Sequence, residues 1–257
     1  MGTRNWIVLG ASAFIAFLIA LIPATLLAPL LAAHLPPALQ VKSSEGTIWR
    51  GALILARLSR AGAPSRLTWR FRPERLLRGE LAAELVLSED RCRIGAIAGR
   101  GLSGMTVGDV TGICRAERIA ELLPALAIWQ PRGVVSTSGG SLALRSHRAD
   151  GVVVIDRIEG EQAVNINGLG VAQSTLESLG TYRFDLKGEG AGLRVNLATV
   201  TGPLRLSGDG RYLAPAAATF TGKAAAESAE AAALEGLLKL LGPRLPDGSV
   251  AIDLKLQ

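Results

Sequence analysis

The sequence predicts a mainly β protein. An N-terminal transmembrane helix is followed by an elongated, glycine-rich antiparallel β domain made of two tandem units, each with a short C-terminal amphipathic helix. Three observations support this prediction: a long uncharged run near the N-terminus, short alternating segments separated by many of the 30 glycines, and one helix–turn–strand pattern that occurs twice. Hydrophobic residues make up 49% of the 257 residues, which excludes an intrinsically disordered protein.

The first element is an apolar run without a charged side chain, from Trp6 to Ala33. A bilayer core of roughly 30 Å needs about 20 such residues in a helix, so residues 6–33 are predicted to be a transmembrane anchor. Pro23 and Pro29 place the helical span itself near residues 6–27. A secretory signal peptide is the competing interpretation, but its apolar region usually has only about 7–15 residues.

The orientation of this anchor follows from the basic residue before it. Arg4 favours a cytoplasmic tail of residues 1–5. The remainder of the chain is therefore expected in the periplasm of a bacterium, as a single-pass protein of the inner (plasma) membrane.

A proline-bounded linker at residues 34–40 leads into the β-rich part. Apolar residues then recur at every second position in short runs, which is the pattern of half-buried strands. Glycines separate these runs at intervals of about 8–12 residues, as in antiparallel hairpins. The predicted strands lie in the segments 47–58, 80–88, 141–146, 151–158, 163–172, 182–188, 193–198, 203–210 and 249–256.

Two segments have helical periodicity instead, with leucines on one face. The second set lies 115 positions after the first, and a Pro-x-Gly-x-Val turn follows each. Thr68–Phe71 is likewise echoed at Thr181–Phe184. We interpret this as an internal duplication with β units at 41–145 and 150–257, and chance similarity is the alternative. The helical positions are Ile119, Leu122, Leu123 and Leu126, and Leu234, Leu237, Leu238 and Leu241.

The two cysteines, Cys92 and Cys114, both lie between apolar, strand-like stretches. A disulfide between them is possible in an oxidising compartment, and two separate buried thiols are the alternative.

Residues that carry enzymatic chemistry are sparse. His34 and His147 are far apart in the sequence, and Gly99–Gly104 matches Gly-x-Gly-x-x-Gly but is not followed by a helical segment. The net charge of +6 comes without a basic stripe or stacking aromatics, which argues against nucleic-acid binding. We therefore expect no enzyme activity, no cofactor and no metal site.

The aromatic residues offer candidate contact positions. Trp49, Trp69 and Trp129 fall in or beside the first predicted unit, and Arg50 follows the first of them. Core packing is the default role of such tryptophans. Because Trp and Arg are over-represented at binding hot spots, a partner-binding patch is the alternative.

Several of these motifs together resemble those of the type II (general) secretion system protein N family. Residues 43–53, "SSEGTIWRGAL", are similar to its Gly-[Thr/Ser]-x-Trp-x-Gly opening. The C-terminal part resembles the family in Gly202-Pro203, Phe220-x-Gly222, Leu237–Gly242 and Asp247-Gly248.

The resemblance implies a non-enzymatic, membrane-anchored scaffold that takes part in the export of folded proteins. Its partners would be other inner-membrane and periplasmic components of the secretion system, together with the lipid bilayer around residues 6–33. The family also resembles periplasmic bridge-like lipid-handling proteins. This second likeness implies the alternative, a lipid-binding or lipid-transfer module whose apolar β groove holds acyl chains.

Overall fold

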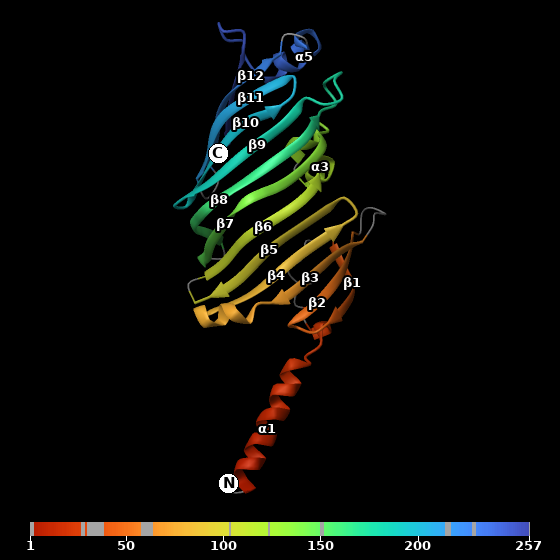
Figure 1. The fold of residues 1–257 in the computed structure, drawn as a ribbon, viewed down its shortest axis with the longest axis vertical. Coiled ribbons are helices and arrows are strands. Elements are labelled where there is room, and N and C mark those ends of the chain that lie inside the picture. Colours follow the sequence, from red (N-terminus) through yellow and green to blue (C-terminus); the bar gives the residue numbers. More distant parts are fainter. Residues whose placement is uncertain are drawn as a thin grey trace. The chain divides into compact units, whose positions relative to one another are not determined.

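The computed structural model confirms a mainly β protein, whose described residues form thirteen strands and a few helices (Figure 1). The chain divides into two compact units, Met1–Asp90 (unit 1) and Arg91–Gln257 (unit 2). In each unit the strands are antiparallel and stand in the sheet in chain order. The structure describes residues 3–26, 29, 39–57, 64–102, 104–122, 124–149, 152–213, 217–227 and 230–256.

Unit 1 begins with helix α1 (Thr3–Ala20), on which apolar side chains such as Phe14 and Phe17 are exposed. The helix ends before the apolar run does. Pro23 disfavours a helical conformation at the residue before it, and Ala24, in the short helix η1 (Ala24–Leu26), is buried in the core of unit 1.

The predicted anchor at residues 6–33 therefore overlaps both a helix and a segment that packs into the folded unit. Among the described residues, no helix has both the length and the hydropathy that crossing a bilayer requires. Residues 27, 28 and 30–38, which include His34 and most of the predicted linker, lie outside the described residues.

The sheet of unit 1 has a small core on one face. Its strands are β1 (Leu39–Gly46), β2 (Arg50–Arg57), β3 (Ser65–Phe71) and β4 (Glu80–Glu89), and the short helix η2 (Pro73–Arg78) connects the last two. Alternate residues of β2, Leu53 and Leu55, are buried with Trp69 and Ala24. The alternation seen in the sequence therefore directs these side chains to one face.

Unit 2 contains the remaining nine strands and the larger core. Its elements are β5 (Cys92–Gly101), β6 (Gly104–Arg115), α3 (Ala116–Leu122), α4 (Pro124–Ala127), β7 (Arg132–Ala149), β8 (Val152–Gly170), β9 (Gly180–Glu189), β10 (Gly192–Thr201), β11 (Leu204–Leu213), β12 (Ala217–Ala226), α5 (Ala231–Leu241) and β13 (Val250–Leu256).

Helix α5 packs on the core of unit 2 through its leucines. Leu234, Leu237 and Leu238 are buried there and Leu241 is partly buried, so this helix covers one end of the apolar face. The earlier leucine segment is also helical, as α3 and α4, but its buried side chains include Ala116 and Ala120.

The other predicted helical positions of this earlier segment are less buried or are not described. Ile119 is partly buried and Leu126 is exposed, whereas the side chain of Leu122 and the whole of Leu123 lie outside the described residues.

The two compact units meet after Asp90. β7, which ends at Ala149, pairs with β8, which begins at Val152. The tandem β units at 41–145 and 150–257, and the internal duplication itself, stay a prediction.

Candidate functional site

Strand β13 forms an open edge at the end of the sheet in unit 2. Among the described strands it pairs only with β12, in continuous register from Val250 to Leu256. Its first residues are covered on the other side, because the Ala251 N–H donates to the carbonyl oxygen of Pro243 at 2.9 Å. From Ile252 onward the outward backbone groups face no described strand, so this edge can accept one.

Strand β1, at the start of the sheet in unit 1, has an irregular edge. Its register with β2 shifts between Val41 and Ser43, and this bulge places the charged Lys42 at the irregularity. Bulges and lysines are common means by which natural sheets prevent edge-to-edge pairing. β13 has no such shift, so it is the better candidate for docking.

The side chains of β13 differ between the two faces of the strand. Ile252 and Leu254 point to one face, and the Leu254 side chain is 59% exposed. Asp253 and Lys255 point to the other face, where their charged groups lie 3.5 Å apart. A strand that adds to this edge would therefore meet apolar groups on one face and charged groups on the other.

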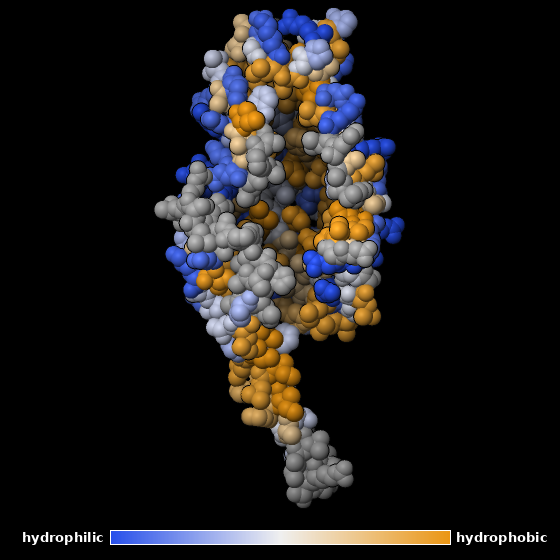
Figure 2. Space-filling model, turned by 180° about the vertical axis from the view of Figure 1, so that it is seen from behind, coloured by the Kyte–Doolittle hydropathy of each residue, from blue (hydrophilic) through white to orange (hydrophobic). Residues whose placement is uncertain are grey.

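The face of the unit 2 sheet that carries Ile252 is apolar across five strands. Residues at alternate positions of β9 to β13 lie on it, and most are only partly buried because α5 covers one end alone. Figure 2 shows hydrophobic residues lining a hollow at the level of these strands. The apolar face consists of Phe184, Leu186, Leu193, Val195, Leu197, Leu206, Tyr212, Phe220, Ile252 and Leu254.

Glycines make room for the side chain of Phe220 on this apolar face. The ring of Phe220 lies against Gly208, Gly210 and Gly222, where a β-carbon would come within 3.1 Å of the ring. The role of these glycines was not predicted from the sequence. An available signal was their alternate spacing on neighbouring strands beside an aromatic residue.

The opposite face of the same sheet is polar. A cavity of about 450 Å³ there is bordered by paired charges, including Arg183 with Asp185 at 2.8 Å and Lys187 with Glu161 at 2.6 Å. The hydrogen bond to Glu161 raises the pKa of the Lys187 amine. Because these charges neutralise one another, the polar face offers little net charge to a ligand.

The candidate contact residues do not form one patch. Trp69 is only 7% exposed and its indole N–H donates to the Ile48 carbonyl at 3.0 Å, so it is a core residue of unit 1. Trp129 packs against the core of unit 2. Trp49 is partly buried, and of the four predicted residues only Arg50 is exposed.

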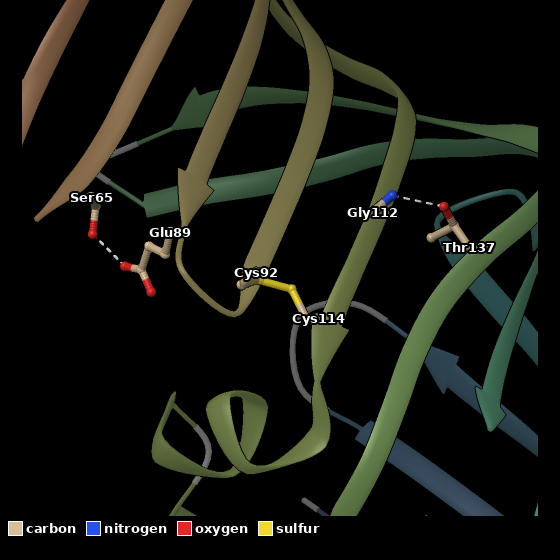
Figure 3. Close-up of a disulfide and its surroundings, with 6 residues drawn as sticks. All are labelled: Ser65, Glu89, Cys92, Gly112, Cys114 and Thr137. Carbon is tan, nitrogen blue, oxygen red and sulfur yellow. Dashed lines mark hydrogen bonds between the residues drawn. A yellow bond between two sulfur atoms is a disulfide. The ribbon is translucent and has the colours of Figure 1, made fainter. Parts of the chain in front are cut away.

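Cys92 and Cys114 lie opposite each other on β5 and β6 and are joined by a disulfide (Figure 3). The bond links two neighbouring strands of unit 2. Its position is structural, because neither residue borders the β13 edge or belongs to the apolar face.

The histidine that belongs to the described residues has an acidic neighbour. His147 Nδ1 lies 2.6 Å from Asp156 Oδ1 on the surface of the β7–β8 hairpin. In the part of the chain that the structure describes, no group of three His, Cys, Asp or Glu residues is placed to hold a metal ion.

Comparison with known proteins gives one match. Neither the curated proteins nor the solved structures yield a match. A family model described as "Type II secretion system (T2SS), protein N" matches residues 37–253, which covers most of the chain, including every strand from β1 to β12. The chain therefore belongs to the protein N family of the type II secretion system.

Proposed function

We propose that the chain is a non-enzymatic docking subunit of the type II secretion system, anchored in the inner membrane, whose β13 edge accepts a strand from another component. Family membership supports the role in secretion. The single observation on which the docking mode rests is the uninterrupted β13 edge, open from Ile252 onward.

Membrane anchoring is supported by helix α1. Apolar side chains such as Phe14, Phe17 and Leu18 are exposed on it, and a helix that exposes such residues needs an apolar environment. With residues 6–33 in or at the inner membrane, the β strands of units 1 and 2 would lie in the periplasm. The Cys92–Cys114 disulfide fits that oxidising compartment.

Strand addition suits a scaffold because backbone groups supply the contacts. A partner strand gains hydrogen bonds to the edge and, through Leu254, an apolar contact on one face. The geometry also indicates which backbone donors are available. Since the Ala251 N–H points away from β12, the N–H groups of Asp253 and Lys255 at alternate positions point outward as well.

A proline substitution tests this docking mode. Asp253→Pro removes one outward donor and leaves the bonds to β12 in place, whereas the matched control Asp253→Ala keeps the donor. With a photo-crosslinking residue at Lys255 in intact cells, we expect the parent chain and Asp253→Ala to capture another secretion-system component, identified by mass spectrometry. Asp253→Pro should lose the adduct and reduce export. Capture by Asp253→Pro at the parental level would contradict the proposal.

The partly exposed apolar face supports a second candidate function, the binding of phospholipid acyl chains. Val195 on β10 points to this face, whereas Asn196, the next residue, points to the polar face. Photo-crosslinking residues at these two positions therefore form a matched pair. A phospholipid adduct at position 195 and none at 196 would support lipid binding. No adduct at position 195 would exclude acyl chains from this part of the face.

A further inference from the structure

Helix η2 lies at the same end of unit 1 as the C-terminal end of α1. The Trp49 indole N–H donates to the Ile19 carbonyl of α1 at 2.9 Å, and the Ile48 N–H donates to the Ile22 carbonyl at 3.0 Å. The Phe71 N–H in turn donates to the Trp49 carbonyl at 2.7 Å. η2 begins two residues after Phe71, so a short series of contacts links it to the end of α1.

η2 and the start of β4 expose three leucines. The exposed fractions are 51% for Leu76, 92% for Leu77 and 58% for Leu81. Apolar side chains gain free energy on leaving water, so this exposure is unfavourable in an aqueous environment. Figure 2 shows hydrophobic residues gathered at the lower margin of unit 1, on the side where Figure 1, turned by 180°, draws the coil between β3 and β4.

The turn that carries these leucines is well braced. Gly79 adopts the left-handed conformation that ends η2, and its N–H donates to the Leu76 carbonyl at 2.9 Å. Two ion pairs hold the flanks, Arg72 with Glu84 at 2.7 Å and Arg75 with Glu80 at 3.3 Å. The exposed leucines therefore lie on a turn whose conformation is held by a backbone hydrogen bond and two ion pairs.

The surroundings of the turn match the chemistry of a membrane surface. Arg78 is exposed next to Leu77, and basic residues beside apolar ones favour the anionic headgroup region of a bilayer. Trp49, whose ring packs against Phe71 with centroids 5.0 Å apart, lies at the end of α1. Tryptophan is enriched at membrane–water interfaces.

We propose that η2 is a second membrane contact of this chain, in which Leu76, Leu77 and Leu81 enter the headgroup–acyl boundary of the bilayer that holds α1. This inference rests on the proposed membrane anchoring. Its partner is an anionic phospholipid surface, and Arg78 lies at the level of the phosphates.

A second contact has a consequence for the orientation of unit 1. A single helix leaves the attached domain free to tilt and to rotate around the helix axis. The Trp49–Ile19 hydrogen bond connects the β strands of unit 1 to the end of α1, and η2 adds a membrane contact away from the helix axis. Together they set which side of unit 1 faces the membrane.

Three variants of the full chain, each with one added cysteine, test the inference: Phe14→Cys on α1, Leu77→Cys on η2, and Arg66→Cys as the control. Arg66 is exposed on β3, five residues or roughly 17 Å along the strand from Phe71. Each variant is labelled with an environment-sensitive fluorophore without reductant, so that the Cys92–Cys114 disulfide stays closed. The proteins are then reconstituted in phosphatidylethanolamine–phosphatidylglycerol vesicles.

We expect blue-shifted emission and quenching by lipid-borne quenchers at positions 14 and 77, and neither at position 66. A label in lipid at 14 but in water at 77 would overturn the second contact and leave the anchor intact. A label in water at 14 would overturn the anchor itself. If position 77 is shielded in native membranes but not in vesicles, its partner is a protein and the inference is wrong.

Discussion

The aromatic ring of Phe220 lies over the backbone of Gly208. A β-carbon built on Gly208 would stand 2.6 Å from Cζ of that ring, closer than real β-carbons approach other atoms. Gly210, the register partner of Phe220, gives a corresponding distance of 3.0 Å to Cδ2. The ring therefore requires residues without a side chain beneath it on β11. Glycines at these positions determine the shape of the apolar face.

Gly208→Ala should destabilise unit 2. The added methyl group would also lie 2.6 Å from the Thr221 carbonyl oxygen, so a shift of the ring alone does not make room for it. Overpacking of this kind costs about 1–3 kcal/mol. Urea unfolding of the full chain, followed by tryptophan fluorescence, should show a lower midpoint with the same slope.

Gly236→Ala is the matched control. Gly236 lies within α5, and a β-carbon there has open space, with no atom within 4 Å. Because alanine is the better helix former, we expect a gain of roughly 0.5–1 kcal/mol. Equal effects of the two substitutions would contradict the role assigned to Gly208.

The strands with strict alternation were predictable from the sequence. In β9, and over most of β10 and β11, apolar and polar residues alternate, and the structure places the alternating residues on opposite faces. The leucines of α5 likewise share a helical face and lie in the core. In these segments local periodicity and tertiary packing agree.

The long strands β7 and β8 were not predicted at full length. Glycines were expected to separate neighbouring strands. Gly139, Gly140 and Gly160 instead lie inside β7 and β8, with positive φ. The β7–β8 register shifts beside Gly140. Glycine marks a bulge as readily as a turn, and only the partner strand decides between the two.

The roles of the tryptophans also depended on distant residues. The indole of Trp69 bonds to Ile48, and that of Trp49 bonds to Ile19, 30 positions earlier. Composition cannot reveal such partners. The leucines of η2 were missed for another reason: they lie in a short turn without periodicity, so only their exposure identifies them.

Tyr182→Phe should destabilise unit 2 without leaving a cavity. The Tyr182 hydroxyl is buried, and its single O–H is shared between the carbonyl oxygens of Leu179 and Leu204, each 2.9 Å away. Its removal leaves these acceptors without that donor, at a cost of about 1 kcal/mol. Thermal unfolding at neutral pH measures the loss, and an unchanged midpoint would contradict it.

The same substitution should change the alkaline limit of stability. Burial raises the pKa of the Tyr182 hydroxyl. The folded state therefore keeps the proton at a pH where the unfolded chain releases it, so stability falls as the pH rises above about 10, the ordinary tyrosine value. Tyr182→Phe should show a shallower fall. Parallel curves for the parent and variant chains would argue against a raised pKa.

Loss of the disulfide should destabilise unit 2. Cys92 and Cys114 close a loop with a sequence separation of 22, and cross-linking a loop of this size contributes about 3 kcal/mol by restricting the unfolded chain. We expect Cys92→Ala/Cys114→Ala to unfold at a lower urea concentration than the oxidised parent. Reductant should shift the parent towards the variant and leave the variant unchanged. A parent that titrates with two free thiols would contradict the bond.

The turn before β13 should make stability sensitive to acid. The Asp247 carboxylate accepts hydrogen bonds from the Ser249 hydroxyl, from Lys223 Nζ at 3.0 Å and from the Ser249 N–H at 3.0 Å, which lowers the pKa of Asp247 to about 2. A lowered carboxyl pKa contributes stability above the unfolded value of about 4, and this contribution is lost as the pH falls towards 2.

Asp247→Asn keeps the shape of the turn but cannot titrate. Its unfolding midpoint should therefore vary less than that of the parent between pH 5 and pH 2. Ser249→Ala removes the hydroxyl donor but keeps the backbone N–H donor, so it should give an intermediate slope. Identical slopes for all three chains would show that this carboxylate does not stabilise the start of β13.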